Sequence, residues 1–517
     1  MYRRLNAVKD TYITNKIVRD SFRATDANVG EAATLDLFKL YDENSISGED
    51  DPVELTRILI KFDLNPLRAL TGSTLDYTSD SFRCDLKLYD VFGGQTVPSN
   101  FKVIAAPLSQ SFDEGVGRDV FKFQDIDAAN FITASTSAGS ANIWFVSGAN
   151  RQGLLGSDDI DIIGSGNLND GNGVVFLYGE QTFTEGTEDL SIDVTTIISG
   201  TLASQIPDYG FRISFSGTQE TDTVTRFVKR FASRHNNNTR KRPRLEVRYN
   251  DAVQDHHESF FFNLSGSVFL NNFERGQPAN IVSGSALSEI TGDDCMRFKV
   301  VTGAFEKVVS ASQHKYGDSL SATGIYSATF AIDSFGSSSL GGEVNSTLED
   351  HIRDSGSVTF RTNWESSDMT VGYHTGSLTI KALNSTAFKN SATRFIINIH
   401  NLKDSYRQGH KIRLRCVAFD DDETVKAVKT PLYRTSQILI KSFYRIRDTY
   451  SDEVVIPFDD DDTFNATLMS TDSDGMYFDI FTDDLEIGRV YTIDVKVKDG
   501  GATQIFKNVG GNFRIEP

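Results

Sequence analysis

Cysteine and long apolar runs are scarce in this chain, and each scarcity excludes a class of protein. The three cysteines of the 517 residues, Cys84, Cys295 and Cys416, lie far apart, which argues against a disulfide framework and a CxxC zinc site. No stretch approaches about 18 consecutive apolar residues, and the first residues, MYRRLNAVKDTYIT, contain no apolar signal-peptide core. We therefore expect no membrane partner, no export signal, and assembly in a reducing cytoplasm.

The chain also lacks the common catalytic and cofactor-binding motifs. Neither a G-x-x-x-x-G-K-[ST] phosphate loop nor a G-x-G-x-x-G fingerprint occurs, and no serine stands in a defensible nucleophile elbow. The eight histidines are scattered, and His256–His257 has no ligand partner at a spacing with helical register. We expect no enzyme activity, no catalytic residue, no metal site and no cofactor. A pair of carboxylates that cleaves polysaccharide remains an alternative.

Runs of aspartate raise the question of calcium. Three stretches could supply oxygen ligands: SDDIDI (157–162), FDDDE (419–423) and PFDDDDTF (457–464). None matches the calcium loop of an EF-hand, and adjacent carboxylates on an extended chain point alternately to opposite sides. We interpret these runs as solvated loops between strands, with calcium binding as the alternative.

Acidic residues outnumber basic ones, and the composition favours strands. The 71 Asp and Glu against 52 Lys and Arg give a net charge of −19, so the chain as a whole repels nucleic acid, which we do not expect as a partner. Forty Gly and 37 Phe, together with many Thr, Ser, Val and Ile, are typical of short strands joined by Gly, Ser, Asn and Asp turns.

Alternating apolar and polar residues recur with turns between them, which predicts an all-β protein made of serial β-sandwiches. The plainest predicted strands are RILIKFDL (57–64), FRCDLKLYDV (82–91), MRFKVVTGAF (296–305), KIRLRCVAFD (411–420) and YTIDVKVKDGG (491–501). A polar linker at 251–259 marks a boundary. We predict domains at 1–250, 251–392 and 393–517, the last immunoglobulin-like, and leave open whether 251–517 forms one domain or two.

Four motifs in the first half occur in a familiar order. RILIKFDL (57–64) is followed by a D-V-T strand in DLSIDVTTII (189–198), by GFRISFS (210–216), and by the closing strand RPRLEVRY (242–249). In this order they resemble the DNRLRE-type β-sandwich domain, across roughly residues 8–250. That family resembles carbohydrate-binding modules and appears in bacterial surface proteins and phage virion proteins, so the resemblance implies a jelly roll.

One segment is basic, although the chain as a whole is acidic. Residues 226–249, RFVKRFASRHNNNTRKRPRLEVRY, contain a cluster of basic side chains opposed only by Glu246. The candidate interface residues are Arg226, Lys229, Arg230, Arg234, Arg240, Lys241 and Arg242. Two interpretations stay open: the basic side chains bind carboxylates or carbonyls within the domain, or they form a patch that docks on an acidic face of a neighbouring subunit.

Together these features predict a structural role. Serial β-domains, an acidic surface and the phage-like resemblance suggest a virion structural protein of a tailed bacteriophage, assembled in the host cytoplasm as a tail, baseplate or neck component. Its expected partners are other virion structural proteins and copies of itself. The alternatives are a capsid decoration protein and an adhesive protein that recognises host polysaccharide, although only Trp144 and Trp364 are available as tryptophan platforms.

Overall fold

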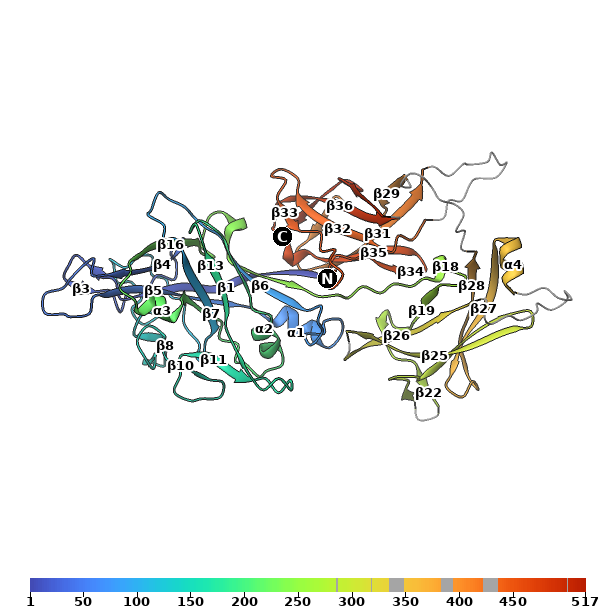
Figure 1. The fold of residues 1–517 in the computed structure, drawn as a ribbon, viewed down its shortest axis with the longest axis horizontal. Helices are drawn as coiled ribbons and strands as arrows, with labels where there is room; N and C mark the ends of the chain where they lie inside the picture. Colours follow the sequence, from blue (N-terminus) through green and yellow to red (C-terminus); the bar gives the residue numbers. More distant parts are fainter. Residues whose placement is uncertain (285–286, 318, 334–347, 383–393, 422–435, 500) are drawn as a thin grey trace. The chain divides into compact units, whose positions relative to one another are not determined.

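The computed structural model describes residues 1–517 except 285–286, 318, 334–347, 383–393, 422–435 and 500. Contacts between residues divide the chain into two compact units (Figure 1). The N-terminal unit comprises Arg3–Thr71 and Phe82–Arg248, and the C-terminal unit comprises Met1–Tyr2, Gly72–Ser81 and Tyr249–Pro517. The predicted boundary between residues 392 and 393 lies outside the described residues.

The N-terminal unit is built on a ten-stranded sheet. Its strands are β1 (Tyr2–Thr14), β4 (Thr34–Tyr41), β5 (Val53–Phe62), β6 (Arg83–Leu88), β7 (Phe101–Pro107), β13 (Gly179–Phe183), β14 (Leu190–Asp193), β15 (Phe211–Phe215), β16 (Arg226–Ala232) and β17 (Arg244–Arg248). The main path runs β13-β7-β15-β5-β1-β17-β6-β14, and β4 joins β5 to β16. Segments from both ends of the unit therefore meet in one sheet.

Strand β5 organises this sheet. One edge of it pairs with β1 from Thr56 to Phe62, while the other edge pairs first with β4 and then with β15. Figure 1 shows β1 and β5 running alongside each other through the unit. Consecutive side chains of β5 are buried on both faces, including Ile58, Leu59 and Ile60, as the near-continuous apolar run of a doubly covered strand requires.

Phenylalanine rings fill the interior between the strands. The Phe101 ring on β7 stacks on Phe183 of β13, with ring centroids 4.7 Å apart, and meets Phe215 of β15 edge-on at 5.5 Å. Phe183 in turn meets Phe231 of β16 edge-on at 6.4 Å. All four rings are almost fully buried. Aromatic rings favour such offset and edge-on contacts, which join four strands into one core.

Smaller elements surround the sheet. They are β2 (Ile17–Val18), β3 (Phe22–Arg23), β8 (Thr133–Ser137), β9 (Ser140–Ile143), β10 (Gln152–Leu154), β11 (Ile162–Asn167), β12 (Val174–Phe176), α1 (Asn65–Thr71), α2 (Thr195–Leu202) and α3 (Gly217–Thr221). The buried Asp161 carboxylate accepts the backbone N–H groups of Phe145, Val146 and Arg151 at 2.7, 3.0 and 2.9 Å. This carboxylate holds the chain after β9 against the start of β10 and β11.

The first part of the C-terminal unit is a seven-stranded sheet in the order β18-β28-β27-β24-β25-β26-β19. Its elements are β18 (Phe260–Phe261), β19 (Ser265–Asn271), β24 (Met296–Thr302), β25 (Phe305–Tyr316), β26 (Leu320–Ala331), α4 (Leu348–Ser355), β27 (Ser357–Ser366) and β28 (Gly372–Lys381). Two short hairpins leave it, β20–β21 (Phe273–Glu274 and Gln277–Pro278) and β22–β23 (Val282–Ser283 and Ser288–Glu289). The core of this part contains Phe298 packed against Trp364 and Phe330.

The last part of the chain contributes two further sheets. One has the order β29-β31-β35-β34, and the other β30-β38-β36-β32-β33 with β37 on β36. The strands are β29 (Phe395–Ile399), β30 (Ser405–Arg407), β31 (Lys411–Asp420), β32 (Ser442–Asp448), β33 (Val454–Ile456), β34 (Ser470–Asp472), β35 (Gly475–Phe481), β36 (Val490–Asp499), β37 (Ala502–Phe506) and β38 (Asn512–Glu516). Both sheets contribute to one core, in which Tyr444 stacks on Phe478 at 4.4 Å.

The prediction of an all-β chain with serial β-domains is confirmed. Strands dominate both units, and the described helices span at most eight residues. The predicted strand at 57–64 overlaps β5 but extends two residues past its end at Phe62, and the one at 411–420 coincides with β31. Sequence analysis placed 72–81 with the first half, whereas its contacts are with the C-terminal unit.

A buried ion pair stabilises the middle of the N-terminal unit. The Arg57 guanidinium on β5 donates to Glu220 of α3 in a bidentate pair at 3.0 and 2.8 Å, and to the Gly148 carbonyl at 2.7 Å. Burial acts to raise the pKa of Glu220, but the adjacent Arg57 outweighs it and holds that pKa below its ordinary value. The pair therefore connects the sheet, the helix and the loop before β10.

We predict that Glu220→Gln lowers the free energy of unfolding of the N-terminal unit by about 3–5 kcal/mol, because it leaves Arg57 buried without a counter-charge. The matched control is Glu180→Gln, which removes an exposed pair with Lys102 and costs less than about 1 kcal/mol. The free energy of unfolding of both variants is measured by urea unfolding of the full chain and, independently, by calorimetry. Equal losses in the two variants would contradict the role given to the buried pair.

Candidate functional site

The basic segment singled out in the sequence lies along β16, the turn after it, and β17. Strand β16 pairs with β4, and β17 lies between β1 and β6 in the sheet. A single 3-10 turn, Thr239–Lys241, separates the two strands and is capped by the Asn238 side chain, which accepts the Arg240 N–H at 3.2 Å. The segment therefore contributes to the sheet itself as well as to a surface turn.

The basic side chains on and just after β16 are paired with carboxylates of the same unit. Their ion pairs are Arg226 with Asp222, Lys229 with Asp90, Arg230 with Asp36, and Arg234 with Glu114. Both Arg230 and Arg234 are bidentate, with N–O distances between 2.5 and 2.7 Å. Such charge-assisted pairs fix geometry as well as neutralise charge. These contacts support the interpretation of the basic side chains as internal ties.

The three remaining candidates lie in the turn. Lys241 is exposed, and its Nζ donates to the Asp90 carbonyl at 2.8 Å. Arg242 is half-buried, and its Nε donates to the Asn236 carbonyl at 3.2 Å. Arg240 is also half-buried. A docking role for the basic segment stays a prediction, and this turn is where its charge is nearest to solvent.

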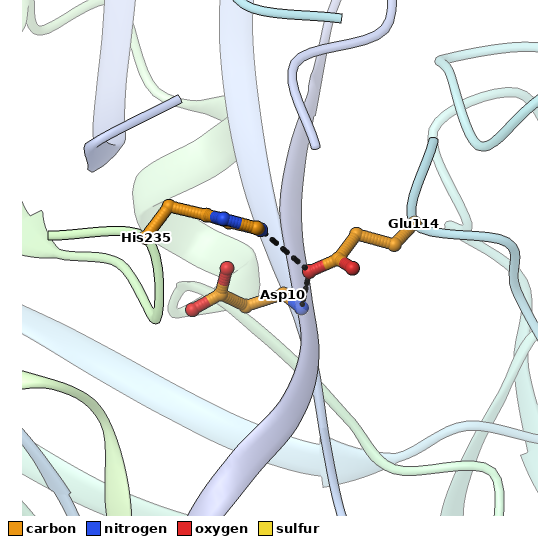
Figure 2. A group of neighbouring side chains, drawn as sticks. All are labelled: Asp10, Glu114 and His235. Atoms are coloured by element: carbon orange, nitrogen blue, oxygen red, sulfur yellow. Dashed lines mark hydrogen bonds and ion pairs between the residues drawn. The ribbon is translucent and has the colours of Figure 1, made fainter. Parts of the chain in front are cut away.

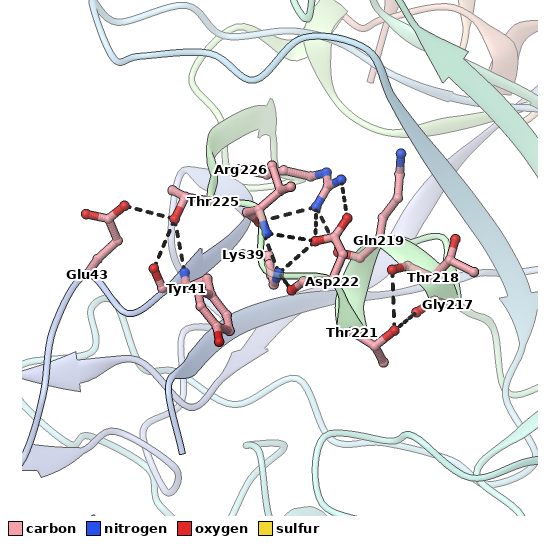
Figure 3. Close-up of polar contacts among 11 residues, drawn as sticks. Lys39, Tyr41, Glu43, Gly217, Thr218, Gln219, Thr221, Asp222, Thr225 and Arg226 are labelled. Carbon is pink, nitrogen blue, oxygen red and sulfur yellow. Dashed lines mark hydrogen bonds and ion pairs between the residues drawn. The ribbon is translucent and has the colours of Figure 1, made fainter. Parts of the chain in front are cut away.

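Figure 3 shows the cluster at the start of β16. The Lys39 side chain is fully buried, and its Nζ contacts Asp222 Oδ1 at 2.9 Å and the Val224 carbonyl at 3.0 Å. Arg226 makes a bidentate contact with the same Asp222 carboxylate at 2.8 and 2.7 Å. These hydrogen bonds, led by that of Arg226, hold the pKa of Asp222 far below its ordinary value. One ionised carboxylate thus neutralises cations from two paired strands.

A second cluster joins three segments that are far apart in the sequence (Figure 2). Asp10 comes from β1, Glu114 from a loop after β7, and His235 from the turn after β16, and one ligand atom of each lies within 4.8 Å of the others. Glu114 Oε1 accepts the Asp10 N–H at 2.9 Å, and His235 Nε2 lies 3.5 Å from it. Asp10 Oδ2 accepts the Arg234 N–H at 2.6 Å.

Two atoms of this cluster have unsatisfied lone pairs. Asp10 Oδ1 and His235 Nε2 are buried and have no hydrogen-bond partner among the described residues. Burial raises the pKa of Asp10 to about 7, although the hydrogen bond from the Arg234 N–H acts to lower it. A metal could use these two atoms, but the Arg234 guanidinium already engages both oxygens of Glu114. Two available ligands fall short of the three protein ligands that a zinc site requires.

Sequence analysis named Arg234 but neither of its carboxylate neighbours. It counted His235 among the scattered histidines, and it gave no role to Asp10 or Glu114. Nothing in the local sequence marks these two, because the distances from Asp10 to Glu114 and to Arg234 along the chain are 104 and 224 residues. The only available signal was the unusual density of Arg in the segment, which requires acidic partners somewhere if the segment is buried.

Comparison with known proteins gives little beyond this geometry. No family model matches the chain, and no curated protein matches it. Among solved structures, the adhesin InvE of Yersinia pseudotuberculosis is 12% identical, with a TM-score of 0.15, and the match covers 48% of this chain and 54% of the adhesin. The N-terminal Ig1-2 module of the Drosophila receptor protein tyrosine phosphatase DLAR is 8% identical, with a TM-score of 0.13, covering 52% and 95%.

The identities and TM-scores of these matches are low. The chain spans about half the length of the adhesin structure that it matches, and TM-scores this low do not establish a shared overall fold. The all-β class therefore rests on the strands themselves. Among the described residues, no helix is long and apolar enough to cross a bilayer.

The Asp10 carboxyl gives a prediction about pH. Because its pKa is about 7 in the folded chain and lies near 4 when unfolded, the folded state binds more protons between these values, and stability falls as the pH rises from 4 to 8. Asp10→Asn removes this dependence. We expect the variant to gain on the order of 3 kcal/mol relative to wild type on going from pH 4 to pH 8.

Thermal unfolding across this pH range measures the effect. Asp113→Asn is the matched control, since the Asp113 side chain is about half exposed and pairs with the half-exposed Lys9 at 3.6 Å. Its difference from wild type should stay nearly constant with pH. A constant difference for Asp10→Asn would show that Asp10 does not titrate in this range.

Proposed function

We propose that this chain is a structural protein that assembles through protein–protein contacts, as a tail, baseplate or neck component in the virion of a tailed bacteriophage. The observation that carries the assembly role is an apolar surface on the N-terminal unit. Its exposed side chains are Ile132, Ile143, Phe145, Val146, Leu154, Val174 and Phe176. Exposed apolar residues gathered in this way mark interaction surfaces more often than isolated ones do.

The three-stranded sheet β10-β11-β12 forms the centre of this apolar surface. Its register aligns Leu154, Ser165 and Phe176 in one row across the strands, and Val174 lies two residues from Phe176 on the same face. Phe176 and Val174 are 74% and 67% exposed. The opposite face packs inward, since Gly166 and Leu177 are buried. The sheet thus has one satisfied face and one apolar face that lacks cover among the described residues.

The neighbouring hairpin extends the surface. Ile143, the last residue of β9, is exposed, as are Phe145 and Val146 after it. The Asp161 carboxylate, which binds the N–H groups of Phe145 and Val146, directly precedes β11. A stable interface buries about 800 Å² on each partner. Side chains from two adjacent strand groups supply the apolar centre that such an interface needs.

The phage setting rests on the DNRLRE-like motifs and on the serial β-domains. The adhesive alternative would need exposed aromatic platforms, and both tryptophans are in the cores, Trp144 at 2% and Trp364 at 4% exposure. One exposed aromatic pair is Phe176–Tyr178, whose ring centroids lie 5.6 Å apart. That pair belongs to the apolar surface, which favours a protein partner over a hydrated sugar.

We predict that the double substitution Val174→Ser and Phe176→Ser abolishes self-association. Both side chains are exposed, so the melting temperature should stay within about 2 °C while the buried apolar area of the interface is lost. Sedimentation velocity of the full chain measures the oligomeric state. Phe273→Ser is the matched control, because Phe273 is 62% exposed in the C-terminal unit. A wild-type chain that stays monomeric at high concentration would contradict self-assembly through this surface.

The basic turn is tested separately. Reversing Arg240, Lys241 and Arg242 to Glu should weaken assembly and make it less sensitive to salt if the turn docks on an acidic neighbour. If the three side chains serve only the unit itself, the variant loses stability through the contacts of Lys241 with Asp90 and of Arg242 with Asn236. Sedimentation at two salt concentrations, together with the melting temperature, distinguishes the two outcomes.

A further inference from the structure

A lysine and an aspartate meet in the interior of the N-terminal unit. Lys229 on β16 is 0% exposed, and its Nζ contacts Asp90 Oδ1 directly. Asp90 follows β6 and forms an isolated bridge with Phe231, two residues after Lys229. The backbone therefore holds both side chains in register, although 139 residues separate them in the sequence.

The surroundings of the amine are largely apolar. The Phe231 ring centroid lies 4.9 Å from Lys229 Nζ, and that of Phe183 lies 5.4 Å away. The other acceptor of Nζ is the Glu188 carbonyl at 2.8 Å. Burial lowers the pKa of Lys229, although Asp90 and neighbouring carboxylates act to raise it. A desolvated lysine amine gains nucleophilic character because less of it is protonated.

A third carboxylate adjoins the pair. Glu188 Oε1 accepts the N–H groups of Thr184 and Glu185 at 2.7 and 2.8 Å, which fixes the side chain. Its other oxygen, Oε2, is buried and unpartnered within the described part of the chain. Burial acts to raise the pKa of Glu188, but hydrogen bonds from surrounding backbone N–H groups lower it, so the carboxylate is ionised and adds to the negative charge around the Lys229 amine.

We propose that Lys229 and Asp90 condense into an intramolecular isopeptide bond. Proton transfer within the buried pair first gives a neutral amine and a neutral carboxylic acid, the forms that a low dielectric favours. The Nζ lone pair then attacks Asp90 Cγ, a C–N bond forms, and the Cγ–OH bond breaks. The hydroxyl leaves as water with a proton from Nζ. No oxidant or reductant is needed, and one water is lost.

Holding the two groups in contact supplies the driving force. Intramolecular positioning converts an unfavourable reaction between separate molecules into one with a high effective concentration. The product amide also removes two charges from an apolar interior, where a buried ion pair is weakly stabilising at best. The bond would join β16 covalently to the segment after β6.

A second buried lysine provides an internal comparison. Lys39 is equally buried and contacts Asp222 Oδ1 at 2.9 Å. Asp222, however, also binds Arg226 in a bidentate pair, which keeps the carboxylate ionised and therefore a poor electrophile. We expect condensation at Lys229 and none at Lys39.

Intact-mass measurement of the purified full chain tests the proposal. We expect a mass below that of the sequence by one water, about 18 Da, and a tryptic digest in which peptide 88–102 is joined to peptide 227–230, because trypsin cannot cleave after a modified Lys229. Lys229→Arg keeps the positive charge but cannot form the bond, so it should show its full sequence mass. Lys39→Arg is the matched control and should retain the loss.

Each other outcome overturns the proposal. A wild-type chain with its full sequence mass after prolonged incubation at neutral pH would show that the pair remains ionic. A loss of one water that maps to a single linear peptide would show dehydration of one segment instead of a cross-link. Persistence of the loss in Lys229→Arg would assign it to another site. Because the wild-type mass is decisive by itself, the test does not depend on any variant folding.

Discussion

The N-terminal unit depends on the pairing of buried cations with carboxylates. Lys39, Arg57, Arg226 and Lys229 are all nearly inaccessible to solvent. Lys39, Arg57 and Lys229 each meet an acidic side chain from a distant segment, and Arg226 shares with Lys39 the carboxylate of Asp222, four residues before it. An unpaired charge in such positions would cost several kcal/mol, so each pair restricts which strands can lie next to one another. The C-terminal unit uses similar pairs, for example where the fully buried Asp494 binds Arg445 and Arg447.

This constraint explains which parts of the structure the sequence could predict. Strand β5 was predictable because its apolar residues occupy consecutive positions between polar loops, a local signal. The thirteen-residue strand β1 gives a weaker local signal, since its buried Asp10 and Thr11 interrupt the apolar pattern. Their burial is made possible by the turn after β16 and the loop after β7, which local periodicity does not reveal.

The candidate site was predictable to the same limited extent. The density of basic residues between 226 and 249 identified the segment, but its meaning depended on whether carboxylates lie opposite. Asp36, Asp90 and Glu114 come from three different parts of the chain, and no spacing rule connects them to β16. The association of Gly72–Ser81 with the C-terminal unit is likewise non-local: Asp76 accepts the Ser319 hydroxyl at 2.9 Å, across 243 residues.

The N-terminal unit therefore combines ion pairs buried in its interior with apolar side chains exposed at its surface. It buries the side chains of Lys39 and Lys229, which favour water, while Val174 and Phe176 lie largely exposed. In an isolated unit this distribution lowers the free energy of unfolding, because apolar area left in water contributes nothing to folding. Under the assembly role proposed above, a neighbouring subunit would bury this apolar surface, whose exposed side chains include Val174 and Phe176.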